Sequence, residues 1–578
     1  MPASNTSLRW CNVCNVPLLS EKCDTCKGSG FSLKVRKPAD LRPVFEEERK
    51  LILETLDKQY EKGAGRKILY DNHLIFANKI FYIDQAYEII SDGKIIGHFF
   101  FDVYDYNWSF KPMEHGSFRI FKNLNLGVFM ENSKVGDEFK INESNFSLKM
   151  KYLPIYNKYG VFGVAQILNE RRVKIIKTFL PISREEETKP SSLKDVLDAN
   201  LEYVRKKESK AVAFIHKISS RIKKPVCVSY SGGKDSLTTL ILVLKAGLKP
   251  KVSFTNTGIE LPETIENVNK VAKKFGLELL ISNANESFWK GLDVFGLPSR
   301  DYRWCCKIVK LIPTARLYKK EFPEGSLTFV GQRALESRSR ARTGSVWKNY
   351  WIPKSISASP INDWDMLTVW IYLLYEDAFN LVNKAYFYGF DRIGCYLCPS
   401  CSIGDYLYLK NIHPNIWRKF EERLMEKFLS EESPFIKYHL WRWKKVPNKI
   451  KSITGDVSRN YKAYTVKRSE ETTEIIVNKK IDKETLEEFF KILEDFEKPD
   501  ILLKHENKII LNLKNKDEKS IISVILRAAY CQECRSCEIW CPSEAISFNQ
   551  EGRIHIDETK CKKCKVCTEK CPIVEFLL

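Results

Sequence analysis

The spacing of cysteines constrains this chain more than any other feature of its 578 residues. All of its 18 cysteines except Cys227 stand in spacings that are typical of metal ligands. Two C-x2-C pairs lie near the N-terminus, five cysteines lie in the middle, and two C-x2-C-x2-C-x3-C runs lie near the C-terminus. Because thiolates in such spacings surround metal centres, we expect a protein whose smaller parts fold around metals.

The N-terminal group predicts a zinc ribbon. Residues 1–30 are too few to bury a hydrophobic core, so a metal must hold them together. Cys11, Cys14, Cys23 and Cys26 offer four thiolates, which suit one tetrahedral Zn(II) without any redox role. A small iron–sulfur site is the alternative interpretation of the same four cysteines.

The C-terminal runs resemble those of bacterial two-cluster ferredoxins, since Pro542 or Pro572 directly follows each quartet. In that family the fourth cysteine of each run binds the other cluster. The resemblance implies two [4Fe–4S] clusters, one on Cys531, Cys534, Cys537 and Cys571, and one on Cys561, Cys564, Cys567 and Cys541. Such a fused pair passes low-potential electrons, so we expect an electron donor among the partners. Purely structural clusters are the alternative.

The cellular compartment follows from what the chain lacks. It opens MPASNTSLRW, with no apolar signal segment, so we expect a cytoplasmic protein with free thiols rather than disulfides. No uncharged apolar run approaches the ~20 residues that a membrane span needs. We therefore expect no membrane contact, and the oligomeric state cannot be predicted from these features.

The charge balance points to anionic partners. Lys and Arg number 94 against 73 Asp and Glu, a net charge of +21. A surface this positive attracts polyanions, so RNA, including tRNA, is an expected partner. The alternative is a protein that is merely rich in lysine.

Changes in composition divide the chain. After a polar linker at 183–195, strand and helix patterns alternate, which predicts a doubly wound parallel sheet and an α/β multidomain fold. The segment ISDGKIIGHFFFD resembles a hairpin of PUA-type RNA-binding barrels. We expect a zinc ribbon (1–30), a helical connector (31–66), a β-rich PUA-like domain (67–182), a nucleotide domain (195–410), a helical, basic and aromatic extension (411–469), a small α/β connector (470–528) and a two-cluster ferredoxin domain (529–578).

A glycine-rich loop predicts a phosphate site. It lies between strand PVCVSY and helix LTTLILVL, where two glycines let backbone amides and the helix N-terminus face an anion. Its glycine and lysine are too close together for a GxxxxGK[ST] loop. The expected phosphate ligands are Ser231, Gly232, Gly233, Lys234, Asp235 and Ser236.

Several motifs in order resemble the phosphoadenylyl sulfate and adenylyl sulfate reductase family of the PP-loop, or adenine-nucleotide α-hydrolase, superfamily. They are SGGKDS, TNTGIELPET, RWCCKIVK, VGQRALESRSR, SPINDWDMLTVWIYL and DRIGCYLCPS, and they span roughly residues 200–410. The resemblance implies an adenine nucleotide at the loop, with Thr257 and Gly258 nearby. It also implies an oxyanion pocket, whose forked guanidinium groups suit sulfate or phosphate, lined by Arg333, Glu336, Ser337 and Arg340.

The central cysteines carry the same resemblance. Adenylyl sulfate reductases hold a [4Fe–4S] cluster beside the nucleotide with cysteines placed like Cys305, Cys306, Cys395 and Cys398, which implies a third cluster here. Cys401 is additional. It is either a spare ligand or a catalytic nucleophile, and with Arg333 and Lys234 it completes the expected catalytic residues.

Three functions are compatible with these motifs. The favoured one is ferredoxin-driven reduction of an adenylylated sulfur oxyanion. The second is ATP-dependent sulfur insertion into RNA, because this chain lacks the family's C-terminal Glu-Cys-Gly-(Leu/Ile)-His tail and keeps Lys234, which is typical of loops that cleave ATP. The third is a non-catalytic RNA-binding redox sensor.

Overall fold

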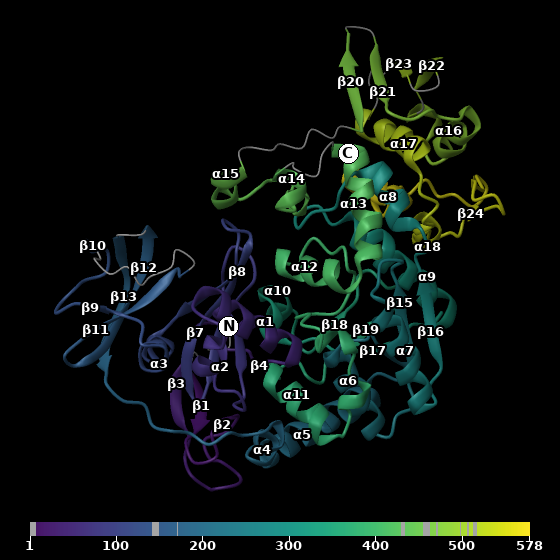
Figure 1. Cartoon of the computed structure of the whole chain (residues 1–578). Coiled ribbons are helices and arrows are strands. Elements are labelled where there is room, and N and C mark those ends of the chain that lie inside the picture. Colours follow the sequence, from purple (N-terminus) through teal and green to yellow (C-terminus); the bar gives the residue numbers. More distant parts are fainter. Residues whose placement is uncertain are drawn as a thin grey trace.

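The computed structural model describes residues 7–140, 150–169, 172–428, 434–454, 463–469, 472–497, 499–505, 508–512 and 517–578. Residues 1–6 of the expected ribbon, 141–149 of the expected β-rich domain and 455–462 of the expected extension lie outside them. The predicted class is confirmed: this is a multidomain α/β protein with a central parallel sheet (Figure 1). No helix in the described ranges is long and apolar enough to cross a membrane.

The N-terminal third contains three antiparallel sheets. The ribbon has the order β2-β1-β3, and the two larger sheets have the orders β4-β5-β6-β7-β8 and β10-β13-β12-β11-β9, with β9 parallel to β11. Their strands are β1 (Ser7–Cys11), β2 (Val16–Leu18), β3 (Phe31–Lys34), β4 (Leu41–Pro43), β5 (Phe76–Lys79), β6 (Ala86–Ser91), β7 (Lys94–Asp102), β8 (Asn107–Pro112), β9 (Val128–Phe129), β10 (Glu138–Lys140), β11 (Tyr152–Asn157), β12 (Gly160–Asn169) and β13 (Arg172–Ile182).

One apolar core joins the two larger sheets. It contains side chains from both sheets and from the helices α1 (Glu46–Gln59), α2 (Ala64–Leu69) and α3 (Glu114–Leu124). Strand β4 pairs with β5, so the chain before residue 67 already contributes to this part. Strand β4 also contacts helix α11 (Met366–Tyr375) of the next domain.

The nucleotide domain has the strand order β16-β15-β14-β17-β19-β18, in which only β18 is antiparallel. From β14 the chain builds outward to β16 and then returns to β17 on the other side. Ligands bind at such a reversal, beyond the carboxyl ends of the strands. The strands are β14 (Val226–Ser229), β15 (Lys251–Asn256), β16 (Leu279–Asn283), β17 (Leu327–Val330), β18 (Val346–Lys348) and β19 (Ile356–Ala358).

Local signals explain the helices around this sheet. Helix α7 begins with Pro262 in its first turn and ends at Gly276, whose φ of 61° closes the helix. Helix α6 is buried on nearly all sides, in keeping with its apolar sequence. The helices are α4 (Leu193–Asp198), α5 (Leu201–Arg221), α6 (Lys234–Lys245), α7 (Pro262–Phe275), α8 (Ser287–Phe295), α9 (Ile312–Glu321), α10 (Arg338–Thr343) and α11, with a π-helix η1 (Cys306–Leu311).

The C-terminal parts pack onto this domain. One continuous core runs from α8 to the end of the chain and includes Phe295, Trp441, Phe489 and Ile573. Helices α12 (Ile403–Ile412), α13 (Pro414–Phe428), α14 (Pro434–Lys437) and α15 (Asn448–Thr454) come first. A connector follows, with β20 (Tyr464–Arg468), β21 (Thr473–Val477), α16 (Lys483–Phe490), β22 (Asp500–His505), β23 (Lys508–Asn512) and α17 (Glu518–Tyr530). The terminal module has α18 (Ser536–Trp540), β24 (Ile546–Phe548), β25 (Ile554–Ile556), α19 (Val566–Glu569) and α20 (Pro572–Leu577).

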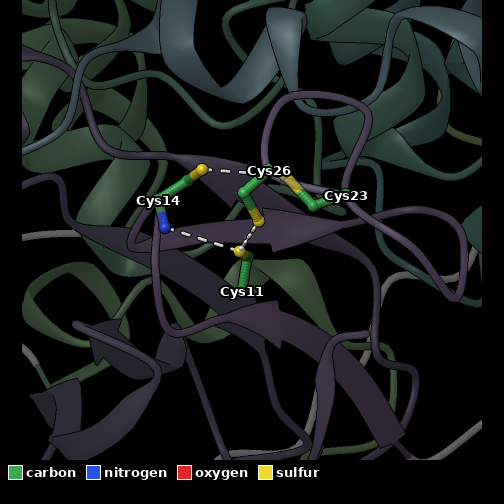
Figure 2. Close-up of side chains that lie close together, drawn as sticks. All are labelled: Cys11, Cys14, Cys23 and Cys26. Atoms are coloured by element: carbon green, nitrogen blue, oxygen red, sulfur yellow. Dashed lines mark hydrogen bonds between the residues drawn. The ribbon is translucent and has the colours of Figure 1, made fainter. Parts of the chain in front are cut away.

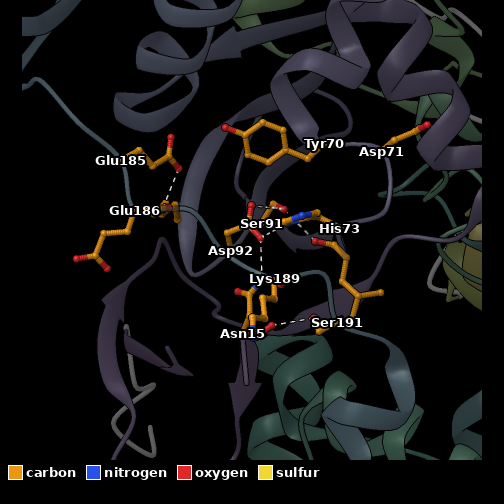
Figure 3. Close-up of polar contacts among 12 residues, drawn as sticks. Asn15, Tyr70, Asp71, His73, Ser91, Asp92, Glu185, Glu186, Lys189 and Ser191 are labelled. Carbon is orange, nitrogen blue, oxygen red and sulfur yellow. Dashed lines mark hydrogen bonds and ion pairs between the residues drawn. The ribbon is translucent and has the colours of Figure 1, made fainter. Parts of the chain in front are cut away.

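The segment expected as a linker is held in place (Figure 3). Asn15 of the ribbon donates to Asp92 at 2.8 Å and to the Lys189 carbonyl at 2.8 Å. The buried Arg119 joins Asp92, at 2.9 Å, to Glu185, at 2.7 Å. The ribbon, the β-sheets and the linker segment therefore meet at a polar junction.

Candidate functional site

The four N-terminal cysteines converge in the ribbon (Figure 2). Their sulfur atoms all lie within 4.8 Å of one another, and no other set of candidate ligands among the described residues meets that condition. Cys11 Sγ is 3.4 Å from Cys26 Sγ, and Cys23 Sγ is 3.7 Å from Cys14 Sγ. A tetrahedral Zn(II) with Zn–S bonds of about 2.3 Å separates its sulfur ligands by about 3.8 Å. The donor set therefore fits one metal ion.

The glycine-rich loop connects the carboxyl end of β14 to α6. Gly232 has a φ of 74°, which favours glycine, and the Ser231 amide donates to Ser236 Oγ at 3.2 Å. Tyr386 closes one side, with its hydroxyl 3.3 Å from the Lys234 amide. The loop is thus wrapped around the helix N-terminus, where its amides suit a phosphate.

Three charged side chains lie below this loop. Lys234 Nζ is 2.7 Å from Asp235, and Arg333 Nε donates to the other oxygen of Asp235 at 2.7 Å. Burial alone would raise the Asp235 pKa. The positive charges of Lys234 and Arg333 have the larger effect and lower that pKa to about 2. Both predicted catalytic cations are therefore already paired with a carboxylate.

Arg333 has a second carboxylate partner that sequence reasoning missed. Its Nη1 donates to Asp40 at 2.9 Å, and the Met366 amide donates to the same carboxyl group at 2.6 Å. Asp40 immediately precedes β4, in the N-terminal third. No local motif marks it, because its role depends on the packing of two distant segments.

The other residues of the expected oxyanion pocket are placed as follows. Arg340 forms an ion pair with Glu336, and Ser337 Oγ accepts a hydrogen bond from the Arg340 amide, so Ser337 caps α10. Desolvation and the neighbouring cation Arg392 lower the Arg340 pKa. Arg340 therefore lies near the guanidinium groups of both Arg392 and the buried Arg333.

The central cysteines lie beside the nucleotide loops. Cys395 Sγ is 3.4 Å from Thr257 Oγ1, and Thr257 in turn donates to Glu260 at 2.8 Å. Gly258 follows with a φ of 75°, and a Cβ atom there would come within 2.2 Å of the Asn285 carbonyl. The loop after β15 therefore links the cysteine site to the sheet edge that carries the phosphate loop.

The five cysteines influence one another. The hydrogen bond with Cys401 lowers the Cys398 pKa to about 4, and the hydrogen bond with Cys305 lowers the Cys306 pKa to about 6. The same bond with Cys398, together with burial, raises the Cys401 pKa. A small cavity of about 20 Å³ is lined by Cys395, Cys401, Arg392 and Asp405, among others.

Two arginines beside these cysteines were also missed. Arg303 Nη2 lies 3.2 Å from Cys306 Sγ and 3.9 Å from Cys398 Sγ, while its buried Nε has no hydrogen-bond partner among the described residues. Desolvation alone would lower the Arg392 pKa. The negative charges of Cys401 and Cys398 have the larger effect and raise it. Their positions just before Cys305 and Cys395 were the available signal. Cations next to thiolates suit a negatively charged centre.

The C-terminal cysteines form two groups. The distal set, Cys541, Cys561, Cys564 and Cys567, lines one small cavity of about 10 Å³. The proximal set consists of Cys531, Cys534, Cys537 and Cys571. Burial raises the pKa of the first three thiols, and the negative charge of Cys571 raises it further, most clearly at Cys534. In both sets one cysteine comes from the opposite run.

A buried cation, Arg527, interacts with cysteines of both sets. Arg527 is 1% exposed, and its Nη1 lies 3.6 Å from Cys567 Sγ and 2.8 Å from Thr568 Oγ1. Its Nη2 has no partner within the described residues. An unsatisfied buried guanidinium group beside thiols is costly unless a negative centre occupies the site, so the residues fit iron–sulfur clusters.

The aromatic and basic segment near residue 442 is a packing element. Trp441 and Arg442 are fully buried, and Arg442 donates to the Cys401 carbonyl at 2.6 Å and to Asp84 at 3.0 Å. These side chains hold the loop of Cys401 and are not available to stack on RNA bases.

Comparisons with known proteins agree with this geometry. Residues 225–401 match the phosphoadenosine phosphosulfate reductase domain, so the chain contains an α/β nucleotide domain of that class. The uncharacterized protein MJ0066 of Methanocaldococcus jannaschii is 36% identical over 469 residues, which cover 76% of this chain and 96% of that protein. This chain belongs to the same family as MJ0066.

More distant matches cover about a third of the chain. The sulfate adenylyltransferase subunit 2 of Chelativorans sp. is 28% identical over 206 residues, 31% of this chain and 66% of that protein. The crystal structure of phosphoadenylyl-sulfate reductase from Candida auris, a phosphate complex, aligns with 18% identity and a TM-score of 0.26, covering 34% of this chain and 95% of that chain.

Proposed function

We propose that this protein is an iron–sulfur sulfonucleotide reductase. It binds adenylyl sulfate or phosphoadenylyl sulfate, accepts two electrons and releases sulfite and the corresponding nucleotide. The observation that carries this proposal is the contact of 3.4 Å between Cys395 and Thr257, because Thr257 follows β15 at the sheet edge that also carries the phosphate loop. A sulfonate attached to a nucleotide phosphate would extend from one site to the other.

Different residues bind the two ends of the proposed substrate. The amides of Gly232, Gly233 and the α6 N-terminus hold the nucleotide phosphates. Lys234 provides a cation that Asp235 keeps in position. Arg392 and Arg303, which lie beside the cysteines, bind the sulfonate oxygens, since a guanidinium fork matches this geometry.

Cys401 is the proposed nucleophile, because the other four central cysteines are those that the family resemblance assigns to a cluster. Asp405 lines the same cavity, and its Oδ1 has no hydrogen-bond partner among the described residues. Burial raises the Asp405 pKa, so this carboxylate is suited to accept the Cys401 proton. The thiolate attacks sulfur, an S–S bond forms, and the sulfur–oxygen bond to the nucleotide breaks. Two electrons then cleave the S–S bond, which releases sulfite and restores the thiolate.

Iron–sulfur clusters on the central and C-terminal cysteines would supply these electrons one at a time. The donor sets fit, because guanidinium groups lie beside the cysteines: Arg303 lies beside Cys306, and the buried Arg527 lies beside Cys567. An external low-potential one-electron donor completes the balance.

The test is anaerobic incubation with adenylyl sulfate or phosphoadenylyl sulfate and dithionite, followed by assay of sulfite and nucleotide. Sulfite release that requires reductant and no ATP supports the proposal. Cys401→Ser should abolish release but keep nucleotide binding. Arg392→Gln should slow release at least tenfold, whereas Arg342→Gln, on the exposed side of α10, should not.

A second candidate is ATP-dependent sulfur transfer to RNA. Lys234 favours it, because a cation in the loop suits cleavage of ATP, and relatives named sulfate adenylyltransferase subunit 2 match 31% of this chain. Here AMP and pyrophosphate should appear from ATP only when RNA is present, and RNA binding should weaken steeply with salt. RNA-stimulated pyrophosphate release without sulfite would replace the first proposal. Binding without any turnover would favour the redox sensor.

A further inference from the structure

The C-terminal module is docked on the nucleotide domain through two of its helices, α18 and α20. Ile539 of α18 packs with Ile312 and Ala315 of α9. In α20, the Phe576 ring lies 6.2 Å from that of Phe295, and the Phe576 carbonyl accepts a hydrogen bond of 3.2 Å from Tyr302. These contacts are short and partly apolar, so the orientation of the module is defined.

Those two helices position two of the four proximal cysteines. Cys537 lies within α18, and Cys571 is the residue that caps the start of α20. The distal set faces elsewhere: its cavity is closed by Ile492 of the connector, and Lys563 forms an ion pair of 3.3 Å with Glu494 there. The two sets are thus not equivalent with respect to the nucleotide domain.

Lys307 lies at the point where the proximal set meets the central cysteines. It follows Cys306 directly in the π-helix η1. Its side chain is 4% exposed, forms an ion pair with Glu575 of α20, and places Nζ 4.5 Å above the ring of Trp351. Burial lowers the Lys307 pKa to about 8, against the opposing influence of Cys571 and Cys534. One buried cation is therefore close to ligands of both centres.

From this arrangement we propose a direction for the electron path. Electrons enter at the distal set, pass to the proximal set, and cross to the central cysteines at the contact around Lys307 and Trp351. The inference rests on the proposed function only in assuming iron–sulfur clusters at these cysteines. Each transfer oxidises the proximal centre by one electron and reduces the central one by one, and the external one-electron donor restores the distal centre. Cys531 of the proximal set and Cys564 of the distal set are both exposed, so the entry side is assigned from the docking: the proximal set is the one that adjoins the nucleotide domain.

Reduction potentials test the path without any substrate. In Lys307→Met the side chain keeps its length but loses its charge, so the proximal and central centres should both become harder to reduce. Lys563→Met is the matched control, because Lys563 lies beside Cys564 on the distal side. It should shift only the distal centre. Potentials are read from the intensity of electron paramagnetic resonance signals at poised redox levels. A shift of the distal centre alone in Lys307→Met would overturn the proposal.

Spin coupling gives an independent readout. In the fully reduced protein, the signal of the central centre should be broadened by the proximal one. Cys534→Ser should remove that broadening, and Cys564→Ser should leave it. Persistent broadening in Cys534→Ser, with the proximal iron lost, would reject the path. Iron analysis distinguishes a wrong electron path from a wrong proposed function. About twelve irons per chain are expected if all three sites hold clusters, whereas about eight would mean that the central site holds none.

Discussion

Asp40 and Arg333 are 293 positions apart in the chain, yet they form a buried ion pair of 2.9 Å directly beside the phosphate loop. The second oxygen of Asp40 accepts the Met366 amide, at the start of α11. The N-terminal β-sheets thereby supply part of the wall of the nucleotide site. This contact explains why Arg333, expected to be a free oxyanion ligand, is 1% exposed and shared between two carboxylates.

The Asp40 contact can be tested by Asp40→Asn. Removing one partner of a buried ion pair typically costs about 3–5 kcal/mol, and Asp235 still compensates Arg333, so we expect a loss near the lower end. The free energy of unfolding can be measured by urea titration. Because Arg333 retains more net charge, pyrophosphate should bind more tightly by calorimetry. Asp363→Asn, which removes an exposed partner of Lys207, is the control and should change neither quantity. Unchanged stability in Asp40→Asn would contradict the role of the pair.

The charge cluster also predicts a response to acid. Its folded-state Asp235 pKa of about 2 is below the ordinary value of 3.8, so the contribution to stability is present above about pH 4 and is lost as the pH falls through 2. The free energy of unfolding should therefore decline between these limits. In Asp235→Asn the decline should be shallower. An equally steep decline in the variant would show that other groups dominate.

Lys234→Ala tests the nucleotide loop. Loss of a charged hydrogen-bond donor should weaken adenine-nucleotide binding by about 1.5–3 kcal/mol, and zinc and iron content should not change. Lys245→Ala, in the last turn of the same helix, is the matched control and should bind normally. Calorimetry with ATP and both sulfonucleotides provides the measurement. Equal affinity for all of them in Lys234→Ala would remove the loop from the site.

Metal content tests the cysteine assignments. Anaerobically prepared protein should contain about twelve irons and one zinc per chain. Cys14→Ser should lose zinc and leave iron unchanged, because the ribbon holds a separate donor set. Elemental analysis with the visible absorption of the clusters decides the outcome. Loss of iron in Cys14→Ser would instead indicate an iron–sulfur site in the ribbon.

Much of this molecule was predictable from its sequence. The ribbon, the phosphate loop and the terminal cysteine runs each rely on residues a few positions apart, and the geometry of a C-x2-C turn or a strand–loop–helix unit is set locally. The alternation of strand and helix after residue 195 likewise predicted the parallel sheet, which the structure confirms.

Other features depend on tertiary structure alone. The sequence offered no sign that Asp40 would neutralise Arg333, or that Lys307 would lie between two sets of cysteines. Nor did the basic and aromatic composition of residues 411–469 indicate that Arg442 would be buried against Asp84 and the loop of Cys401. In each case the partner comes from a segment far along the chain. The spacing of residues along the chain determines which side chains can share a metal. Only the packing of whole domains determines which buried charges meet, because a buried charge needs a partner and that partner can come from any part of the chain.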